Sequence, residues 1–567
     1  MTTMAVSPPP LTTPLASRLD PIVARVAANK DAWVRQDIPA RIRLLEQAIA
    51  GVLAVSGEWV RRACEAKGID AASTLAGEEW IAGPMTTVRN LRLLIYALQH
   101  GGAPPPNRVR RGPDGQLVAD VFPHNLRERL MYSHMTVEVW IEPGKPASQG
   151  RIYREKADGI LRDGRLCLVL GAGNVSSIAP LDVVYKLFVE DEVVVVKMNP
   201  VNAYLAPFFR RAFAALVEAG FLDFVEGGAE VGEYLCTHPA VDSIHLTGSD
   251  RTHDAIVWGA TSEEQERRKV ARQPRITKEV TSELGCVTPV LVVPGRWSEG
   301  DLAFQARNVA SMVAQNASFN CNAAKALVLA RGWDQRDAFL DKLHEVFSKL
   351  PPRKAYYPGA LDRYQAFREH YPNARAFGSA GPGVVPWTII PNVPANAGEY
   401  ALTHEAFCGV IAEVSLDVAD AEGFLREATR FANEDIWGSL SAMVLVDGRT
   451  RRRHRAAVEQ ALADLRYGGI GVNVWAGANF ALGVASWGAF PGNTLENIRS
   501  GRGVVHNTML FDYPQKSIVR GPFRLWPTPV WFADHRNLAQ LGQLAMKFES
   551  APSWLKLPGV AVAGMKG

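Results

Sequence analysis

Cysteines are scarce in this chain of 567 residues. Only six occur: Cys64, Cys167, Cys236, Cys286, Cys321 and Cys408. No two of them form a Cys-x-x-Cys pair, and their spacing matches no zinc-binding pattern. Because disulfide frameworks belong to cysteine-dense chains in oxidising compartments, we expect free thiols, no metal site and a cytoplasmic location.

Long apolar runs and an excess of charge are also missing. No uninterrupted apolar stretch approaches the ~18 residues that a membrane-spanning helix needs, so the sequence predicts no membrane span. The formal net charge is only +4, which excludes the strongly basic balance typical of nucleic-acid-binding proteins. Residues 1–17 are rich in proline and threonine and lack the apolar core of a signal peptide, so we expect a disordered tail there.

Hydrophobic patterning predicts an α/β fold. Residues 18–100 carry apolar side chains at three- and four-residue steps, as amphipathic helices do. From residue 164, apolar strands such as RLCLVL and EVVVVK alternate with helical segments. Near-continuous Val, Ile and Leu strands are typical of parallel sheets covered on both faces. A second region of this kind, 287–472, predicts a second parallel-sheet domain, and a chain of this length is expected to form two to four domains.

Cys321, in the second region, and Glu283, just before it, carry possible covalent chemistry. Cys321 lies in the polar stretch SFNCNAAK. A free cysteine usually packs as a small hydrophobe, but polar neighbours also suit a nucleophile that attacks a carbonyl as the thiolate. Glu283 lies in TSELGCVTP, and it is either an ordinary surface carboxylate or a buried general base.

Two further polar residues follow predicted strands of the first region. Asn174, in VLGAGNVSS, is either a turn-forming residue or an amide that stabilises an oxyanion. The turn lacks the dinucleotide-binding pattern Gly-x-Gly-x-x-Gly, since Ser176 stands at the third glycine position. Lys197 ends VVVVK, and its ammonium group either reaches water or contacts a ribose or phosphate.

The order of these motifs resembles the aldehyde dehydrogenase superfamily over roughly residues 30–523. The resemblance rests on five segments: EVVVVKMNP, similar to the strand that ends in a cofactor-binding lysine; HLTGS, similar to the turn that faces the pyrophosphate; SELGCVTP, similar to the Glu-Leu-Gly-Gly base motif; NASFNCNAAK, similar to the nucleophile loop; and HEAFCGVIAEV, similar to Glu-x-Phe-Gly-Pro-Val.

The resemblance implies a division of the chain. It predicts a cofactor-binding domain from residues 18–131 and 153–285, and a catalytic domain from 286–474. A small β arm from 132–152 and 475–525 would join protomers into a homodimer or homotetramer. The C-terminal extension, 526–567, has no counterpart in the family.

The resemblance also implies a reaction, the NAD- or NADP-dependent oxidation of an aldehyde to a carboxylic acid. Cys321 would form a thiohemiacetal and then a thioester, with Asn174 holding the oxyanion and Glu283 activating water. Pro200 stands where many NAD-dependent members carry an acidic ribose contact, so both cofactors remain open. The implied cofactor contacts are Lys197, Gly228, Gly248, Ser249, Leu284, Glu405 and Phe407.

Two other functions remain open at this point. A coenzyme A-dependent acyl-CoA reductase would form the same thioester, but such relatives generally lack the glutamate base. A catalytically silent scaffold would not need Asn174, Glu283 and Cys321 together.

The late aromatic residues either line an apolar substrate tunnel or pack a loop-rich interface; they are Trp475, Phe480, Trp487 and Phe490.

Overall fold

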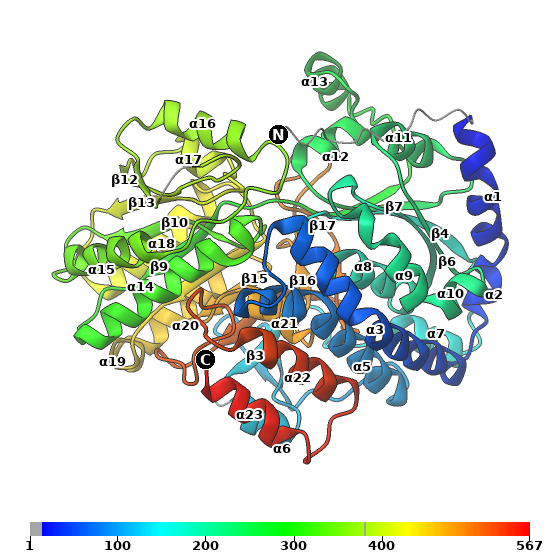
Figure 1. Cartoon of the computed structure of the whole chain (residues 1–567), viewed down its shortest axis with the longest axis horizontal. Helices are drawn as coiled ribbons and strands as arrows, with labels where there is room; N and C mark the ends of the chain where they lie inside the picture. Colours follow the sequence, from blue (N-terminus) through cyan, green and yellow to red (C-terminus); the bar gives the residue numbers. More distant parts are fainter. Residues whose placement is uncertain (1–13, 133, 379–380) are drawn as a thin grey trace.

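The chain forms two lobes, each built on one β-sheet (Figure 1). The computed structural model describes residues 14–132, 134–378 and 381–567. Residues 1–13 of the predicted tail therefore lie outside the described residues. The prediction for the end of the tail is wrong, because helix α1 (Leu15–Ala28) already begins at Leu15.

The first lobe contains a six-stranded sheet in the order β17-β8-β7-β4-β5-β6. Its strands are β4 (Arg165–Leu170), β5 (Glu192–Lys197), β6 (Leu222–Val225), β7 (Ser243–Thr247), β8 (Glu279–Glu283) and β17 (Gly501–Arg502). All pairs are parallel except that of β17 with β8. Every residue of β5 is buried, so both faces of the sheet are covered, as its apolar sequence predicted.

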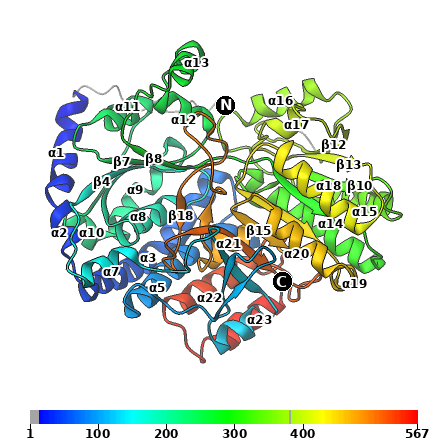
Figure 2. The same cartoon turned by 180° about the vertical axis from the view of Figure 1, so that it is seen from behind.

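Helices from several parts of the chain surround this sheet. They are α1, α2 (Lys30–Val34), α7 (Arg151–Ala157), α8 (Ile178–Phe188), the 3₁₀ turn η3 (Pro200–Leu205), α9 (Ala206–Ala212), α10 (Ala214–Glu218), α11 (Ala229–Thr237), α12 (Asp250–Val257) and α13 (Ser262–Ala271). Helix α13 buries none of its residues and projects at the top of both views (Figures 1 and 2). This helix lies in the charge-dense segment 261–279, which explains its solvation.

The second lobe contains an eleven-stranded sheet in the order β1-β2-β3-β19-β15-β14-β9-β10-β13-β12-β11. The strands are β1 (Arg108–Arg111), β2 (Leu117–Phe122), β3 (Thr136–Ile141), β9 (Thr288–Val292), β10 (Ala324–Ala330), β11 (Arg375–Phe377), β12 (Trp387–Val393), β13 (Val410–Leu416), β14 (Ser441–Leu445), β15 (Gly469–Val472) and β19 (Pro514–Arg520). The centre, from β19 to β12, is parallel, and the strands at both ends are antiparallel.

Three strands lie elsewhere than the sequence-based division assigned them. Strands β1 and β2, assigned to the first cofactor-domain segment, pair beside β3 in the large sheet. Strand β17, assigned to the arm, pairs with β8 in the small sheet. Strands β1, β2 and β3 are neighbours in sequence, and the pairing of β3 with the distant β19 places them in the large sheet. Strand β17 likewise pairs with a strand far away in the sequence, and local hydrophobic patterns do not specify such partners.

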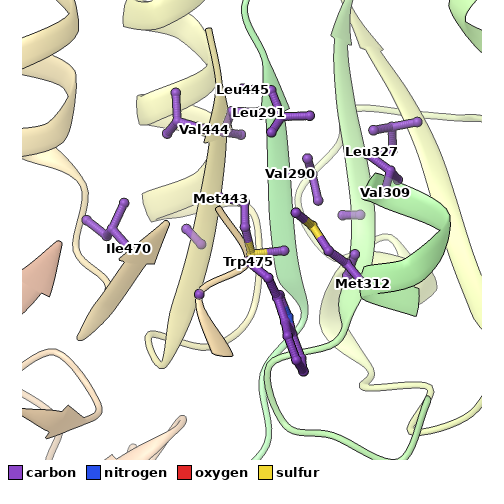
Figure 3. Packing of buried hydrophobic residues seen from close by; sticks show 14 of the residues in the cluster. Val290, Leu291, Val309, Met312, Leu327, Met443, Val444, Leu445, Ile470 and Trp475 are labelled. Atoms are coloured by element: carbon purple, nitrogen blue, oxygen red, sulfur yellow. The ribbon is translucent and has the colours of Figure 1, made fainter. Parts of the chain in front are cut away.

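Apolar side chains from the parallel strands and helix α14 (Glu299–Ala314) meet in the core of the second lobe (Figure 3). Val290 and Leu291 of β9, Leu327 of β10 and Met312 of α14 are all buried. Burying a side chain of this size contributes about 1.5–3 kcal/mol. This packing fixes β10, which follows the loop that carries Cys321.

Further helices cover the second lobe, and a small two-stranded sheet lies near the lobe interface. The helices are the turn η4 (Gln315–Ser318), α15 (Arg336–Lys349), α16 (Ala360–His370), α17 (Tyr400–Thr403), α18 (Ala421–Glu434), α19 (Gly448–Arg453), α20 (Arg455–Asp464) and α21 (Gly477–Leu482). The small sheet pairs β16 (Trp487–Gly488) with β18 (Val504–His506).

The C-terminal extension packs on the N-terminal helices (Figure 2). The elements involved are α3 (Ile38–Lys67), η1 (Thr74–Ala76), α4 (Gly77–Trp80), the π-helical turn η2 (Ile81–Met85), α5 (Thr86–Gln99), α6 (Leu126–Met131), α22 (Leu538–Ser550) and α23 (Leu557–Met565). Glu549 of α22 is buried and accepts from Arg89 of α5 at 2.6 Å and from Arg92. Of the helices described, none combines the length and the hydropathy needed to cross a membrane.

Candidate active site

One cavity of about 790 Å³ lies between residues of both lobes. All ten predicted site residues line it: Asn174, Lys197, Gly228, Gly248, Ser249, Glu283, Leu284, Cys321, Glu405 and Phe407. They come from the ends of β5 and β8, from the turns that follow β4, β6, β7 and β8, and from loops of the second lobe. Ligands of open parallel sheets bind at the carboxyl ends of the strands, and this cavity has that position.

Cys321 and Glu283 are in direct contact. The Cys321 thiol donates to Glu283 Oε1 at 3.1 Å. Glu283 ends β8 and is only 1% exposed, so it is not a surface carboxylate. Cys321 is half-buried and borders the cavity, whereas the other five cysteines are buried. The thiol is therefore hydrogen-bonded to a base and also open to a ligand.

The environment disfavours charge on both groups. Burial raises the pKa of Glu283, because a desolvated carboxylate loses the hydration of its charge. Burial also raises the pKa of the Cys321 thiol well above its ordinary value, and the neighbouring Glu283 charge raises it further. A reactive thiolate here therefore requires that its proton be taken up, and Glu283 is placed to accept it.

The loop before Cys321 has an unusual backbone. Asn316, Ala317 and Ser318 have φ values of 53°, 53° and 69°, a left-handed conformation that non-glycine residues rarely adopt. Such residues cost about 1–3 kcal/mol each. The buried Lys325 offsets part of this cost, since its ammonium group donates to Ser318 O at 3.3 Å and to Ser318 Oγ at 2.8 Å.

A second buried lysine joins this loop to the turn that carries Asn174. Lys67, the last residue of α3, donates to Asn174 O at 3.0 Å and to Asn316 Oδ1 at 3.0 Å. It also forms an ion pair with Glu79 Oε1 at 2.7 Å. One cation thus holds together the two segments that carry the amide and the nucleophile.

The Asn174 side chain points at the nucleophile loop. Its amide Nδ2 donates to Phe319 O at 2.9 Å, and the residue is 6% exposed. An amide nitrogen carries two hydrogens, so one more N–H can bind an oxygen in the cavity. This geometry suits an oxyanion donor better than an ordinary turn residue.

The cavity also contains an ammonium group and one carboxylate oxygen that have no hydrogen-bond partner among the described residues. Within residues 14–132, 134–378 and 381–567, the Lys197 ammonium group forms no hydrogen bond or ion pair, although Lys197 is only 9% exposed. Glu405 Oε1 is buried and also has no partner there. Burial raises the pKa of Glu405 to about 7. A cationic donor suits ribose or phosphate oxygens, and a carboxylate acceptor suits ribose hydroxyls, so a nicotinamide dinucleotide fits these residues.

Two glycines and a helix start complete this end of the cavity. Ser249 caps α12, accepting from Thr252 N at 3.1 Å. The backbone N–H groups at a helix start favour phosphate. A Cβ on Gly285 would lie 2.0 Å from Glu405 Oε2, so only glycine allows the carboxylate to approach there. Gly248 precedes the cap and lines the cavity.

Several cavity residues were not predicted from the sequence. Tyr357, Arg363 and Trp437 also line the cavity. Arg363 donates to Ala406 O at 3.1 Å and to Phe407 O at 3.2 Å, which fixes the loop that carries Glu405. No local motif marks these residues, because they lie in ordinary helices and loops of the second lobe.

The late aromatic residues pack instead of lining the cavity described above. Trp475 is 9% exposed, and its indole N–H donates to Asn322 O at 2.9 Å. Trp487 is 2% exposed, and its ring lies 6.0 Å from that of Phe480. Neither these residues nor Phe490 border the cavity. Their positions favour the packing interpretation over the substrate tunnel.

Comparisons with known proteins match parts of this chain. The model of the aldehyde dehydrogenase family matches residues 183–360. Zebrafish (Danio rerio) 4-trimethylaminobutyraldehyde dehydrogenase B is 34% identical over 96 residues, which span 17% of this chain and only 15% of that relative's length.

Solved structures resemble the whole fold. The aldehyde dehydrogenase KauB from Pseudomonas aeruginosa has a TM-score of 0.58 at 19% identity, with 89% of each chain covered. Aldehyde dehydrogenase C of Pseudomonas syringae, a mutant solved with NAD⁺ and octanal, has a TM-score of 0.59 at 16% identity, with 91% of this chain and 90% of that chain covered. At these identities the likeness establishes the fold. The family model matches the segment that carries Lys197, Glu283 and Cys321, and the fold is that of aldehyde dehydrogenase structures, so both findings support the aldehyde dehydrogenase superfamily.

Proposed function

We propose that this protein oxidises an aldehyde to a carboxylic acid with NAD or NADP. The observation that carries the proposal is the 3.1 Å hydrogen bond from the Cys321 thiol to Glu283 Oε1. It lies in a cavity that Asn174, Lys197 and Glu405 also line. A nucleophile, its base and an amide donor at one cavity are what acyl chemistry through a thiol requires.

The first step is attack of the thiol sulfur on the aldehyde carbon. Glu283 takes the thiol proton as the C–S bond forms, and the carbonyl oxygen becomes the oxyanion of a thiohemiacetal. The second N–H of the Asn174 amide donates to that oxygen. The bound nicotinamide would accept the hydride as the oxyanion collapses, and a thioester of Cys321 remains.

The second step releases the acid. Glu283, deprotonated again after passing its first proton to solvent, accepts a proton from water, and the hydroxide attacks the thioester carbon. The sulfur leaves as the thiolate and recovers a proton. The raised pKa of Glu283 suits this role, because a base works best when its pKa lies near the operating pH. Coenzyme A in place of water would give an acyl-CoA reductase.

The residues that would hold the cofactor are the seven that the resemblance implied. Lys197 is suited to a ribose, the start of α12 beyond Gly248 and Ser249 to the pyrophosphate, and Glu405 to a second ribose. Phe407, Leu284 and Gly228 would give apolar and backbone contacts.

We further propose a cytoplasmic homodimer or homotetramer joined through the arm strands β3 and β19. Light scattering of the purified protein would test the oligomeric state.

The test is turnover by the purified protein. NAD or NADP is supplied with aliphatic and aromatic aldehydes, with and without coenzyme A, and reduced nicotinamide is followed by absorbance. Turnover without coenzyme A is the expected result. Turnover that requires coenzyme A would show that the thioester is transferred to coenzyme A and not hydrolysed. No turnover, together with a Cys321 that thiol reagents do not label, would favour the catalytically silent scaffold.

A further inference from the structure

A second cavity, of about 680 Å³, lies between strand β1 and helices α19 and α20. Three arginines of β1 line it, at positions 108, 110 and 111, and three of the helices do so as well, at 451, 452 and 455. Arg520 of β19 is the seventh. The two arginine-rich segments are separated by more than 300 residues in sequence, and the fold brings them to one space.

Two glutamates line the same cavity, and two of the arginines form ion pairs with them. Arg520 binds Glu459 through both guanidinium nitrogens, at 3.0 and 2.8 Å. Arg520 and Arg110 both contact Glu138 as well. Arg110 has a further, weaker contact with Asp120 at 3.4 Å. The carboxylates of the cavity are therefore already paired.

The other five arginines face the cavity without a counterion. In the part of the chain that is described, no carboxylate lies within ion-pair distance of Arg108, Arg111, Arg451, Arg452 or Arg455. Arg111 donates only to the backbone oxygen of Gly115, at 2.9 Å. The excess of arginine over glutamate in this one cavity exceeds the net charge of the whole chain, which is +4.

Local explanations cover each segment alone but not their juxtaposition. Charged residues on an edge strand such as β1 prevent pairing with other chains. Basic residues near the end of a helix such as α19 interact favourably with its dipole. Neither effect needs the two segments to face each other, and facing like charges repel. A bound anion would turn that repulsion into attraction.

We propose that this cavity binds a small polyphosphate anion, such as pyrophosphate or triphosphate, free or as part of a nucleotide. The guanidinium group donates in a planar fork that matches phosphate oxygens. A phosphate chain presents oxygens in all directions and carries several charges, so it can contact both walls at once. A single carboxylate neutralises only one of the five arginines. The volume lies within the usual range of small-ligand sites.

The experiment is isothermal titration calorimetry of the full-length protein with sodium pyrophosphate, with sodium triphosphate and with ATP. The variant Arg452→Ala/Arg455→Ala removes two exposed, unpaired arginines of the cavity. The control Arg43→Ala/Arg267→Ala removes the same charge from exposed positions that line neither cavity. We expect binding in the wild type, at least about tenfold weaker binding in R452A/R455A and unchanged affinity in the control.

The outcomes separate the possible sources of a signal. Tighter binding of ATP than of triphosphate, lost in R452A/R455A alone, identifies a nucleotide as the ligand. Binding that persists in R452A/R455A comes from elsewhere, including the cofactor cavity, and overturns the proposal. Equal weakening by both double variants means diffuse attraction and overturns it too. Absence of anion binding, with R452A/R455A dissociating an oligomer, assigns the arginines to a second copy of the chain instead.

Discussion

Replacing Glu283 by glutamine tests the contact on which the proposed chemistry depends. The substitution keeps the size of the side chain and removes its charge. The Cys321 thiolate then no longer forms beside an anion. We expect the pKa of Cys321 to fall, because the Glu283 charge is one cause of its elevation. Burial, the larger cause, remains, so the pKa stays above that of a free thiol.

The magnitude follows from the 3.1 Å separation of Cys321 Sγ and Glu283 Oε1. Two unit charges at that distance interact by about 5 kcal/mol at an effective dielectric constant of ~20, and by about 1 kcal/mol in bulk water. Since one pKa unit corresponds to about 1.4 kcal/mol, losing an interaction of this size lowers the pKa of Cys321 measurably.

The assay is the pH dependence of alkylation by iodoacetamide without substrate. Cys321 is the only cysteine not buried among the described residues, and Cys321→Ser provides the blank. The matched control is Glu405→Gln, which removes a second carboxylate of the cavity that affects the thiol less. We expect a larger shift for E283Q than for E405Q. If the E283Q midpoint moved by less than about half a unit, the two groups would not be coupled as argued.

Three further substitutions test other parts of the structure. Asn174→Ala should lower kcat for aldehyde oxidation by about 100- to 1000-fold, the usual effect of removing one oxyanion donor, without weakening cofactor binding measured by fluorescence. Lys67→Met should leave the Glu79 carboxylate buried and unpaired, lowering the free energy of unfolding in urea by about 3–5 kcal/mol. Although burial raises the pKa of Glu549, the charge of Arg89 has the opposite effect, and the pKa lies below its ordinary value. The stability that this ion pair contributes is therefore present above about pH 4 and is lost on further acidification. Glu549→Gln should abolish this acid-induced loss of stability in thermal melts recorded at a series of pH values.

The sequence was sufficient to identify the cavity-lining residues that lie within short motifs. Asn174, Lys197, Glu283 and Cys321 each end a strand or lie in a turn next to one, and the ends of parallel strands meet at one edge of a sheet. Each residue alone had an ordinary explanation. Their order along the chain favoured one shared site over four unrelated residues, and all four line the same cavity.

The sequence was insufficient wherever a role depends on contacts between distant segments. Lys67 ends an amphipathic helix and looks like any basic residue near a helix C-terminus. Its importance comes from contacts with Asn174 and Asn316, which lie 107 and 249 positions away. Strands β1 and β2 were assigned to the wrong lobe for the same reason, since they follow β3 into the large sheet, and β3 is held there by pairing with the distant strand β19.

The position of Cys321 depends on a strained backbone loop that hydrogen bonds from two buried lysines hold in place. Three consecutive left-handed residues, Asn316 to Ser318, would relax if the loop were free. Lys67 holds the first of them and Lys325 the last, and both ammonium groups are buried. Relaxing the loop would deprive each of these buried ammonium groups of its oxygen acceptors in the loop, and this loss opposes the release of strain. The thiol is thereby kept against Glu283 before any substrate binds, in the preorganised geometry that electrostatic catalysis requires.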